Sequence, residues 1–202
     1  MKDHKVTLSI IISILLWLLS CTTACAHPDT ASLQGGFVSG FMHPISGLDH
    51  VVAMLAVGLW GAFLGKPALW ILPITFPLVM AFGGALGVAG VPIPFIETGI
   101  AFSDIVLGLV VLFALRPPLW LAGLTVGFFA IFHGYAHGVE LPNAANPLIY
   151  SIGFVIATGL LHLAGIAIGE LKHLPFGEMI VRAGGALISM IGLGFLTHLI
   201  SV

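Results

Sequence analysis

The chain has 202 residues, of which 59% are hydrophobic and only 7% are charged, with six Lys or Arg against eight Asp or Glu. An ordinary soluble domain carries roughly 25% charged residues, so this composition excludes a soluble enzyme, a disordered protein and a nucleic-acid binder with a basic face. It predicts an all-α protein embedded in a lipid bilayer. The 26 glycines and 12 prolines fit that class, because both residues are more frequent in membrane helices than in soluble ones.

Residues 1–26 have the pattern of a secretory signal peptide. A basic start precedes an apolar run over 6–19, and an Ala-x-Ala motif ending at Ala26 supplies the small residues that a signal peptidase recognises. Cleavage after Ala26 is the first interpretation, while cleavage before Cys21 in a lipoprotein-like box and an uncleaved anchor are the alternatives. Both cysteines lie in this segment, so a chain cleaved after Ala26 has no thiolate to bind a metal.

The remaining residues, 27–202, are predicted to form one domain of six membrane-spanning helices. A spanning helix needs about 20 mostly apolar residues, and Pro and Gly mark the breaks between such stretches. The stretches are 34–64, 68–91, 95–115, 118–140, 146–170 and 177–200. The loops are too short for a soluble domain, so the function has to lie among the helices.

The basic residues predict how these helices are oriented. If the signal places the mature N-terminus outside, the loops after the first, third and fifth helices face the cytoplasm. The basic residues beyond the signal all lie in or beside those loops: Lys66, Arg116, Lys172 and Arg182. This is the positive-inside pattern, and it predicts that both termini of the mature chain face outward.

Within the first helix, three residues are candidate ligands: His43, Asp49 and His50. On a straight helix His43 and His50 are about 10.5 Å apart along the axis, too far for both to bind one ion. They share an ion only if the helix breaks, at Pro44 or Gly47; otherwise they mark two successive sites. Asp49 is predicted to bind the ion or to fix the tautomer of a ligating histidine, or else it pairs with His50 to lock the helix to a neighbour.

The third helix adds two carboxylates, Glu97 near its start and Asp104 on the same face. Glu97 is predicted to contact the metal near the outer surface, with a simple position at the water interface as the alternative. Asp104 lies deeper. Together with His162 of the fifth helix it is placed on an inward path, while His27 would add a chelating amine at the entrance.

In the fourth helix, His133 and His137 are four residues apart and share a face, with Glu140 three residues further on. A charge inside the membrane costs at least about 2.5–3.5 kcal/mol, so such residues need a partner or a function. Two imidazoles one turn apart can hold one divalent ion, as in the zinc-binding H-E-x-x-H helix. The spacing predicts metal contact, with a hydrogen-bond network between helices as the alternative.

The candidates of the first and fourth helices and Glu97 are predicted to meet at one level near the outer surface. Imidazoles and carboxylates without thiolates suit Ni²⁺, Co²⁺, Zn²⁺ or Mn²⁺. Glycines four residues apart, such as Gly83/Gly87 and Gly134/Gly138, predict close packing of the helices that carry them. Histidine patterns in both the first and the fourth helix suggest the hypothesis of two inverted repeats with the site at their interface.

Two motifs resemble those of the HupE/UreJ family of small bacterial membrane proteins, which are associated with hydrogenase and urease maturation: His43-Pro44-x-x-Gly47-x-Asp49-His50 and Phe132-His133-Gly134-x-Ala136-His137-Gly138-x-Glu140. The resemblance covers essentially the whole mature chain. It implies a permease that brings nickel, or in some members cobalt, across the bacterial inner membrane, so that the outward side predicted above for both mature termini is the periplasm. It assigns seven residues to the metal: His43, Asp49, His50, Glu97, His133, His137 and Glu140.

We therefore predict a permease, not an enzyme, whose substrate is a divalent ion: Ni²⁺ first, Co²⁺ next, with Zn²⁺ also a candidate. We expect no permanently bound cofactor and no nucleic-acid partner. The expected partners are the ion and the lipid bilayer, and the sequence allows a homo-oligomer. Binding needs neutral imidazoles, so uptake should fall in acid. An intramembrane zinc hydrolase with Glu140 or Asp49 as general base is the alternative, and a metal-sensing or chaperoning subunit of a larger complex is a third.

Overall fold

The computed structural model describes residues 34–140 and 146–201, and this part of the chain contains helices and no strand. The helices are α2 (Gln34–Ser46), α3 (Leu48–Leu64), α4 (Ala68–Val88), α5 (Ile96–Leu112), α6 (Leu119–Val139), α7 (Pro147–Gly169), the 3-10 helix η2 (Glu170–His173) and α8 (Gly177–Ser201). The prediction of an all-α protein is confirmed, and the predicted stretches coincide with these helices to within a few residues. The predicted signal, 1–26, lies outside the described residues.

The stretch predicted as the first helix is broken in two. α2 ends at Ser46, α3 begins at Leu48, and the two helices are bent by 79° relative to each other. Gly47 between them has an extended backbone, with φ −93° and ψ 117°, and Pro44 lies in the last turn of α2. Both residues disfavour a continuous helix, since proline removes a backbone donor and glycine loses the most conformational freedom on ordering.

Length and apolar composition allow four of the helices to cross a membrane: α4, α6, α7 with η2, and α8. The bent pair α2–α3 makes a fifth span if it is counted as one. The 17 residues of α5 extend over about 25 Å at 1.5 Å per residue, less than the hydrocarbon thickness of about 30 Å. The chain is thus a multi-pass membrane protein, while the count of six spans stays a prediction.

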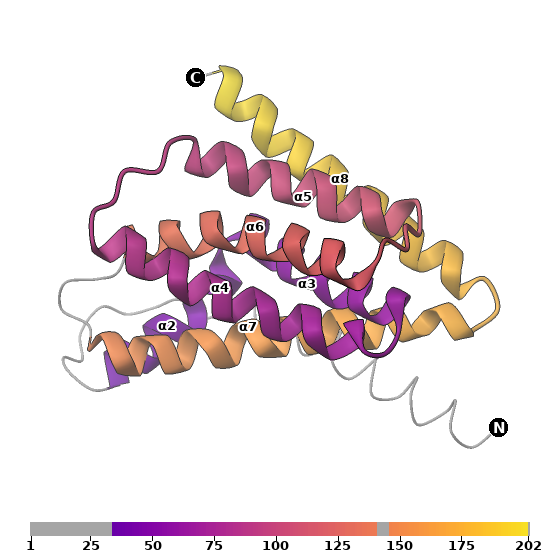
Figure 1. Cartoon of the computed structure of the whole chain (residues 1–202), viewed down its shortest axis with the longest axis horizontal. Coiled ribbons are helices and arrows are strands. Elements are labelled where there is room, and N and C mark those ends of the chain that lie inside the picture. Colours follow the sequence, from indigo (N-terminus) through magenta and orange to yellow (C-terminus); the bar gives the residue numbers. More distant parts are fainter. Residues whose placement is uncertain (1–33, 141–145, 202) are drawn as a thin grey trace. The chain divides into compact units, whose positions relative to one another are not determined.

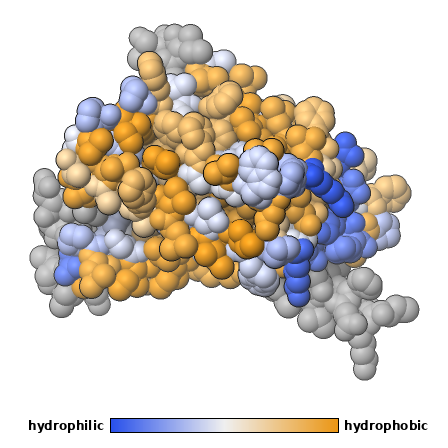
Figure 2. Space-filling view, viewed as in Figure 1, coloured by the Kyte–Doolittle hydropathy of each residue, from blue (hydrophilic) through white to orange (hydrophobic). Residues whose placement is uncertain are grey.

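α3 is the central helix of the described residues. It packs against α4, α5, α7 and α8 (Figure 1), and nearly all of its residues over 52–63 are buried. The helices around it turn apolar side chains outward: on α4, Ile74, Leu78 and Phe82 are 56%, 67% and 59% exposed at four-residue spacing. Figure 2 shows this hydrophobic surface across the helices and strongly hydrophilic side chains gathered at one end, as expected of helices that face lipid.

α4 and α6 approach each other most closely at glycines. A Cβ added to Gly134 or Gly138 of α6 would collide with the backbone of Met80 or Gly84 of α4. The prediction of close packing at the Gly134/Gly138 pair is therefore confirmed, and the contact lets the two backbones meet directly. It also fixes the rotation of α6 about its axis, and with it the direction of the histidine that precedes each glycine.

The basic residues lie where α3, α5 and α7 end and α8 begins, a region that we call the basic end and that comprises Lys66, Arg116, Lys172 and Arg182. Arg182 donates from Nε to the carbonyl of Leu112 in the last turn of α5, at 2.8 Å, and the Nζ of Lys172 donates to the carbonyl of Ala62 in the last turn of α3. A cation beside the C-terminal carbonyls of a helix complements its dipole. The loops that the sequence predicts to be cytoplasmic are therefore on one side of the described residues.

Candidate metal site

His137 of α6 lies at the centre of a group of histidine rings. Its ring centroid is 4.8 Å from that of His43 in α2 and 4.4 Å from that of His50 in α3. The residue is only 7% exposed, and neither ring nitrogen has a hydrogen-bond partner within the described part of the chain. Buried polar atoms are normally hydrogen-bonded, so a buried ring with two unpaired nitrogens beside two other imidazoles has the environment of a metal ligand.

The break at Gly47 meets the condition under which the sequence allows His43 and His50 to share one ion. The 79° bend between α2 and α3 brings both rings against His137, which a straight helix with about 10.5 Å between them would not allow. A Cβ at Gly47 would also lie 2.7 Å from Oδ1 of Asp49 and 3.2 Å from Nδ1 of His50. Gly47 therefore lies at the break between α2 and α3 and also leaves room for the side chains of Asp49 and His50.

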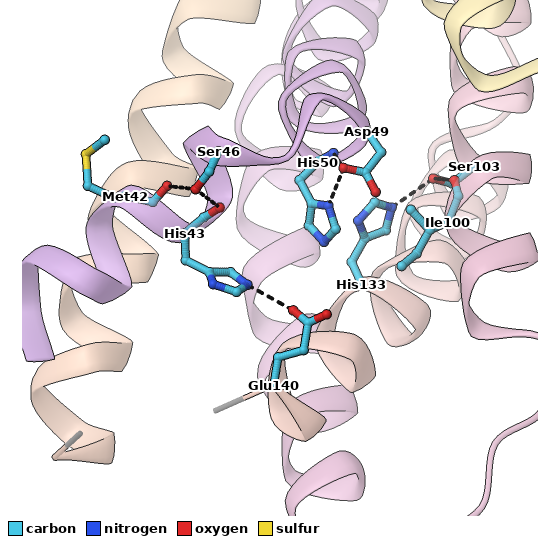
Figure 3. Close-up of polar contacts among 9 residues, drawn as sticks. All are labelled: Met42, His43, Ser46, Asp49, His50, Ile100, Ser103, His133 and Glu140. Carbon is cyan, nitrogen blue, oxygen red and sulfur yellow. Dashed lines mark hydrogen bonds and ion pairs between the residues drawn. The ribbon is translucent and has the colours of Figure 1, made fainter. Parts of the chain in front are cut away.

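His43, His137 and Glu140 form a group in which each residue can offer one ligand atom, with all three atoms within 4.8 Å of one another. Nε2 of His43 lies 3.2 Å from Oε2 of Glu140 (Figure 3). The Glu140 side chain is 56% exposed and follows the last residue of α6, so the group opens toward the surface at this end of the helices. Two imidazoles and a carboxylate suit a divalent transition-metal ion.

A second pair of histidines continues the group toward α5. The ring centroids of His50 and His133 are 4.9 Å apart. Oδ1 of Asp49 accepts a hydrogen bond of 2.8 Å from Nδ1 of His50, and Nε2 of the fully buried His133 lies 2.8 Å from Oγ of Ser103 (Figure 3). We call the four residues His43, His50, His133 and His137 the histidine cluster. The sequence gives no signal for Ser103, because an uncharged serine in an apolar helix shows no pattern.

Glu97 lies beside the histidine cluster and not in the group of three ligands. It occupies the first turn of α5 and lines a cavity of about 70 Å³ together with Asp49 and His198. This cavity connects Glu97 to the Asp49 side of the cluster. His198, which the sequence gives little reason to select, is exposed but turns toward the same cavity.

The two deeper candidates are buried away from Glu140. Asp104 has no exposed surface, and neither of its carboxylate oxygens has a hydrogen-bond partner among the described residues. His162 in α7 is 1% exposed, and the ring of Phe76 lies between it and the cluster, 5.5 Å from both His133 and His162. His27 lies outside the described residues.

The charges around the histidine cluster favour a cation. In the part of the chain that the structure describes, the lysine and arginine ion pairs are at the basic end: Lys172–Glu170 and Arg182–Glu178. The carboxylates of Asp49 and Glu140 contact the cluster, and the ring of Phe154 packs 4.4 Å from that of His137. Anionic oxygens beside apolar walls attract cations strongly, because the low dielectric screens them little.

Comparison with known proteins gives one family and one close relative. A family model described as "HupE / UreJ protein" matches residues 15–195. Protein HupE of Rhizobium leguminosarum bv. viciae is 42% identical over 171 residues, which cover 85% of this chain and 90% of the relative. No solved structure gives a significant match. The stretch that the family model matches contains the whole histidine cluster.

Proposed function

The chain belongs to the HupE/UreJ family, and on that premise we propose that it carries a divalent transition-metal ion across the bacterial inner membrane into the cytoplasm. Family membership supports a role in metal transport for enzymes such as hydrogenase or urease. Within that role we propose nickel as the transported ion, with cobalt as the next candidate. The transported ion would supply metalloenzyme maturation inside the cell.

The observation that carries this proposal is the meeting of imidazoles from α2, α3 and α6. The rings of His43 and His50 lie 4.8 Å and 4.4 Å from the ring of His137 between centroids, although His137 comes from a segment far from the other two in the sequence. Carboxylates join them from Asp49 and Glu140. We propose that four to six ligand atoms from these groups and from His133 hold the ion, and that imidazole nitrogens and carboxylate oxygens replace part of its water shell.

We propose that the ion enters at the cluster end and leaves toward the basic end. The distribution of basic residues, read with the positive-inside rule, supports a periplasmic position for the cluster and for both termini of the mature chain. Glu97 lines a small cavity with Asp49, so it would attract the hydrated ion before binding. Asp104 and His162, both buried, are the groups that we place on the inward path.

A hydrolytic role has less support than transport. An intramembrane zinc hydrolase remains chemically compatible with a histidine–carboxylate set, but the family gives it no support. A hydrolase should keep one equivalent of zinc through purification, whereas a transport site should exchange its ion readily. Metal analysis of the purified protein, before and after dialysis against Ni²⁺, therefore separates the two functions.

The direct test is uptake of radioactive nickel by proteoliposomes that contain only this chain. We expect uptake above that of protein-free vesicles, with inhibition by competing Co²⁺ and weaker inhibition by Zn²⁺. Uptake by the isolated chain would also exclude a role limited to sensing or chaperoning the metal within a larger complex. Vesicles that bind nickel on the protein but never accumulate it would overturn the transport proposal.

A further inference from the structure

His133 is held in one orientation by a serine that no spacing in the sequence indicates. Oγ of Ser103 in α5 lies 2.8 Å from Nε2 of His133 and 2.7 Å from the carbonyl oxygen of Ile100. Ser103 and His133 have no exposed surface, so water does not compete for either contact. The hydrogen-bond partners of the Ser103 hydroxyl therefore determine which ring nitrogen of His133 carries the proton.

A serine hydroxyl has one proton to donate, and a carbonyl oxygen can only accept. The 2.7 Å contact with Ile100 is a hydrogen bond only if Ser103 donates to that carbonyl. The hydroxyl oxygen must then accept a hydrogen bond from the Nε2–H group of His133, at 2.8 Å. His133 is thereby the tautomer with a proton on Nε2 and a lone pair on Nδ1, and this Nδ1 is buried without a partner among the described residues.

The same reasoning gives the opposite tautomer for His50. Oδ1 of Asp49, an acceptor, lies 2.8 Å from Nδ1 of His50, so Nδ1 carries the proton and Nε2 the lone pair. Nε2 of His50 is likewise buried without a partner in the described part of the chain. The two rings stand 4.9 Å apart between centroids, with Asp49 hydrogen-bonded to His50 and Ser103 to His133 (Figure 3).

We propose that Ser103 is a positioning residue of the metal site, which rests on the transport function proposed above. It holds His133 so that Nδ1 binds the ion, while Asp49 holds His50 so that Nε2 binds it. Two neighbouring imidazoles thus present different nitrogens to one ion, and α5 takes part in the site through a hydroxyl that never touches the metal. Groups that fix a ligating histidine in this way commonly change metal affinity by about 10–100-fold when they are removed.

The tautomer can be measured in the absence of transport. Nitrogen-15 NMR of the metal-free protein distinguishes protonated from unprotonated ring nitrogens, and the His133 signals are assigned by their loss in His133→Gln. We expect a protonated Nε2 and an unprotonated Nδ1 in the wild-type chain, and a mixture of tautomers in Ser103→Ala. A wild-type ring protonated on Nδ1 would overturn the proposal, whatever the uptake assay gives.

The functional consequence is measured by nickel uptake into proteoliposomes. We expect Ser103→Ala to raise KM about tenfold with little change in maximal rate, and Ser103→Thr, which keeps the hydroxyl, to restore affinity. Ser189→Ala is the matched control, because this serine also donates to an α5 carbonyl, that of Ile105 at 3.0 Å, but is not part of the histidine cluster. Equal KM values for wild type, Ser103→Ala and Ser189→Ala would contradict the positioning role, whereas absence of uptake by the wild type would contradict the transport function alone.

Discussion

At the scale of single residues, His137 joins the two halves of the candidate site. On one side it meets His43 and Glu140, whose ligand atoms lie with its own within 4.8 Å. On the other side its ring lies 4.4 Å from that of His50, which in turn is held by Asp49. A residue that contacts both groups is the one whose loss should affect binding most.

We expect His137→Ala to abolish nickel uptake and to leave the protein in the membrane. The substitution removes both ring nitrogens from the centre of the cluster, while the helices around it keep their contacts. His173→Ala is the control, because this histidine is exposed on η2 at the basic end and pairs with Glu170 at 3.5 Å. Uptake assays with immunoblots of membrane fractions check both variants, and normal uptake by His137→Ala would rule out the site assigned here.

At the scale of helices, the site depends on one break and one close contact. The bend at Gly47 turns α2 across the end of α3, and the contact between α4 and α6 leaves no room for a side chain at Gly134. The first sets the direction of His43 and the second that of His133 and His137. The close contact depends on glycine because α4 backbone occupies the place where any other residue would put a Cβ, whereas the extended backbone at Gly47 is open to other residues too.

The close contact predicts a difference between two glycines of the same helix. Gly134→Ala should push α6 away from the carbonyl of Met80, at a cost of about 1–3 kcal/mol for overpacking, and should lower uptake by moving the neighbouring histidine. Gly123→Ala should be neutral, because its added methyl group meets no atom within 4 Å. Thermal stability in detergent, followed by fluorescence-detected size exclusion, measures the difference. Equal stability of the two variants would show that α4 and α6 do not meet as described.

At the scale of the whole molecule, the described residues have two chemically different ends. Asp49 and His50 open α3, Glu97 opens α5 and His137 closes α6, while the basic residues lie at the other ends of these helices. Helices α4, α6, α7 and α8 connect the two ends and are apolar enough to cross a membrane. Under the positive-inside rule we propose that the end with the histidine cluster faces the periplasm.

This orientation predicts which loops a membrane-impermeant reagent can reach. A cysteine at Val91, in the exposed turn after α4, should react with an impermeant maleimide in intact spheroplasts. A cysteine at Glu170, in η2 at the basic end, should react only after permeabilisation. The unsubstituted chain is the control, because it shows how much label reacts with the two cysteines near the N-terminus. Labelling of Glu170→Cys but not Val91→Cys in intact cells would reverse the proposed direction of transport.

Much of the helical framework can be predicted from the sequence because it depends on local properties. Apolar stretches between Pro- and Gly-containing breaks gave the ends of α4, α6, α7 and α8 to within a few residues. The spacing of His133 and His137 placed both on one face of α6, since the rise and turn of a helix are fixed by its backbone. The broken first helix was one of two alternatives, because Pro44 and Gly47 permit a break without requiring one.

Sequence by itself determined the class of protein, the helices and the kind of candidate ligand that each helix carries. Only the tertiary structure decided that His43 and His50 meet at His137, that Glu97 stays beside the group of three ligands, and that Ser103 holds His133. The reason is physical: a helix sets its own periodicity through bonds between near neighbours, whereas the bend at Gly47 and the contacts of α3, α5 and α6 depend on packing between segments far apart in the chain.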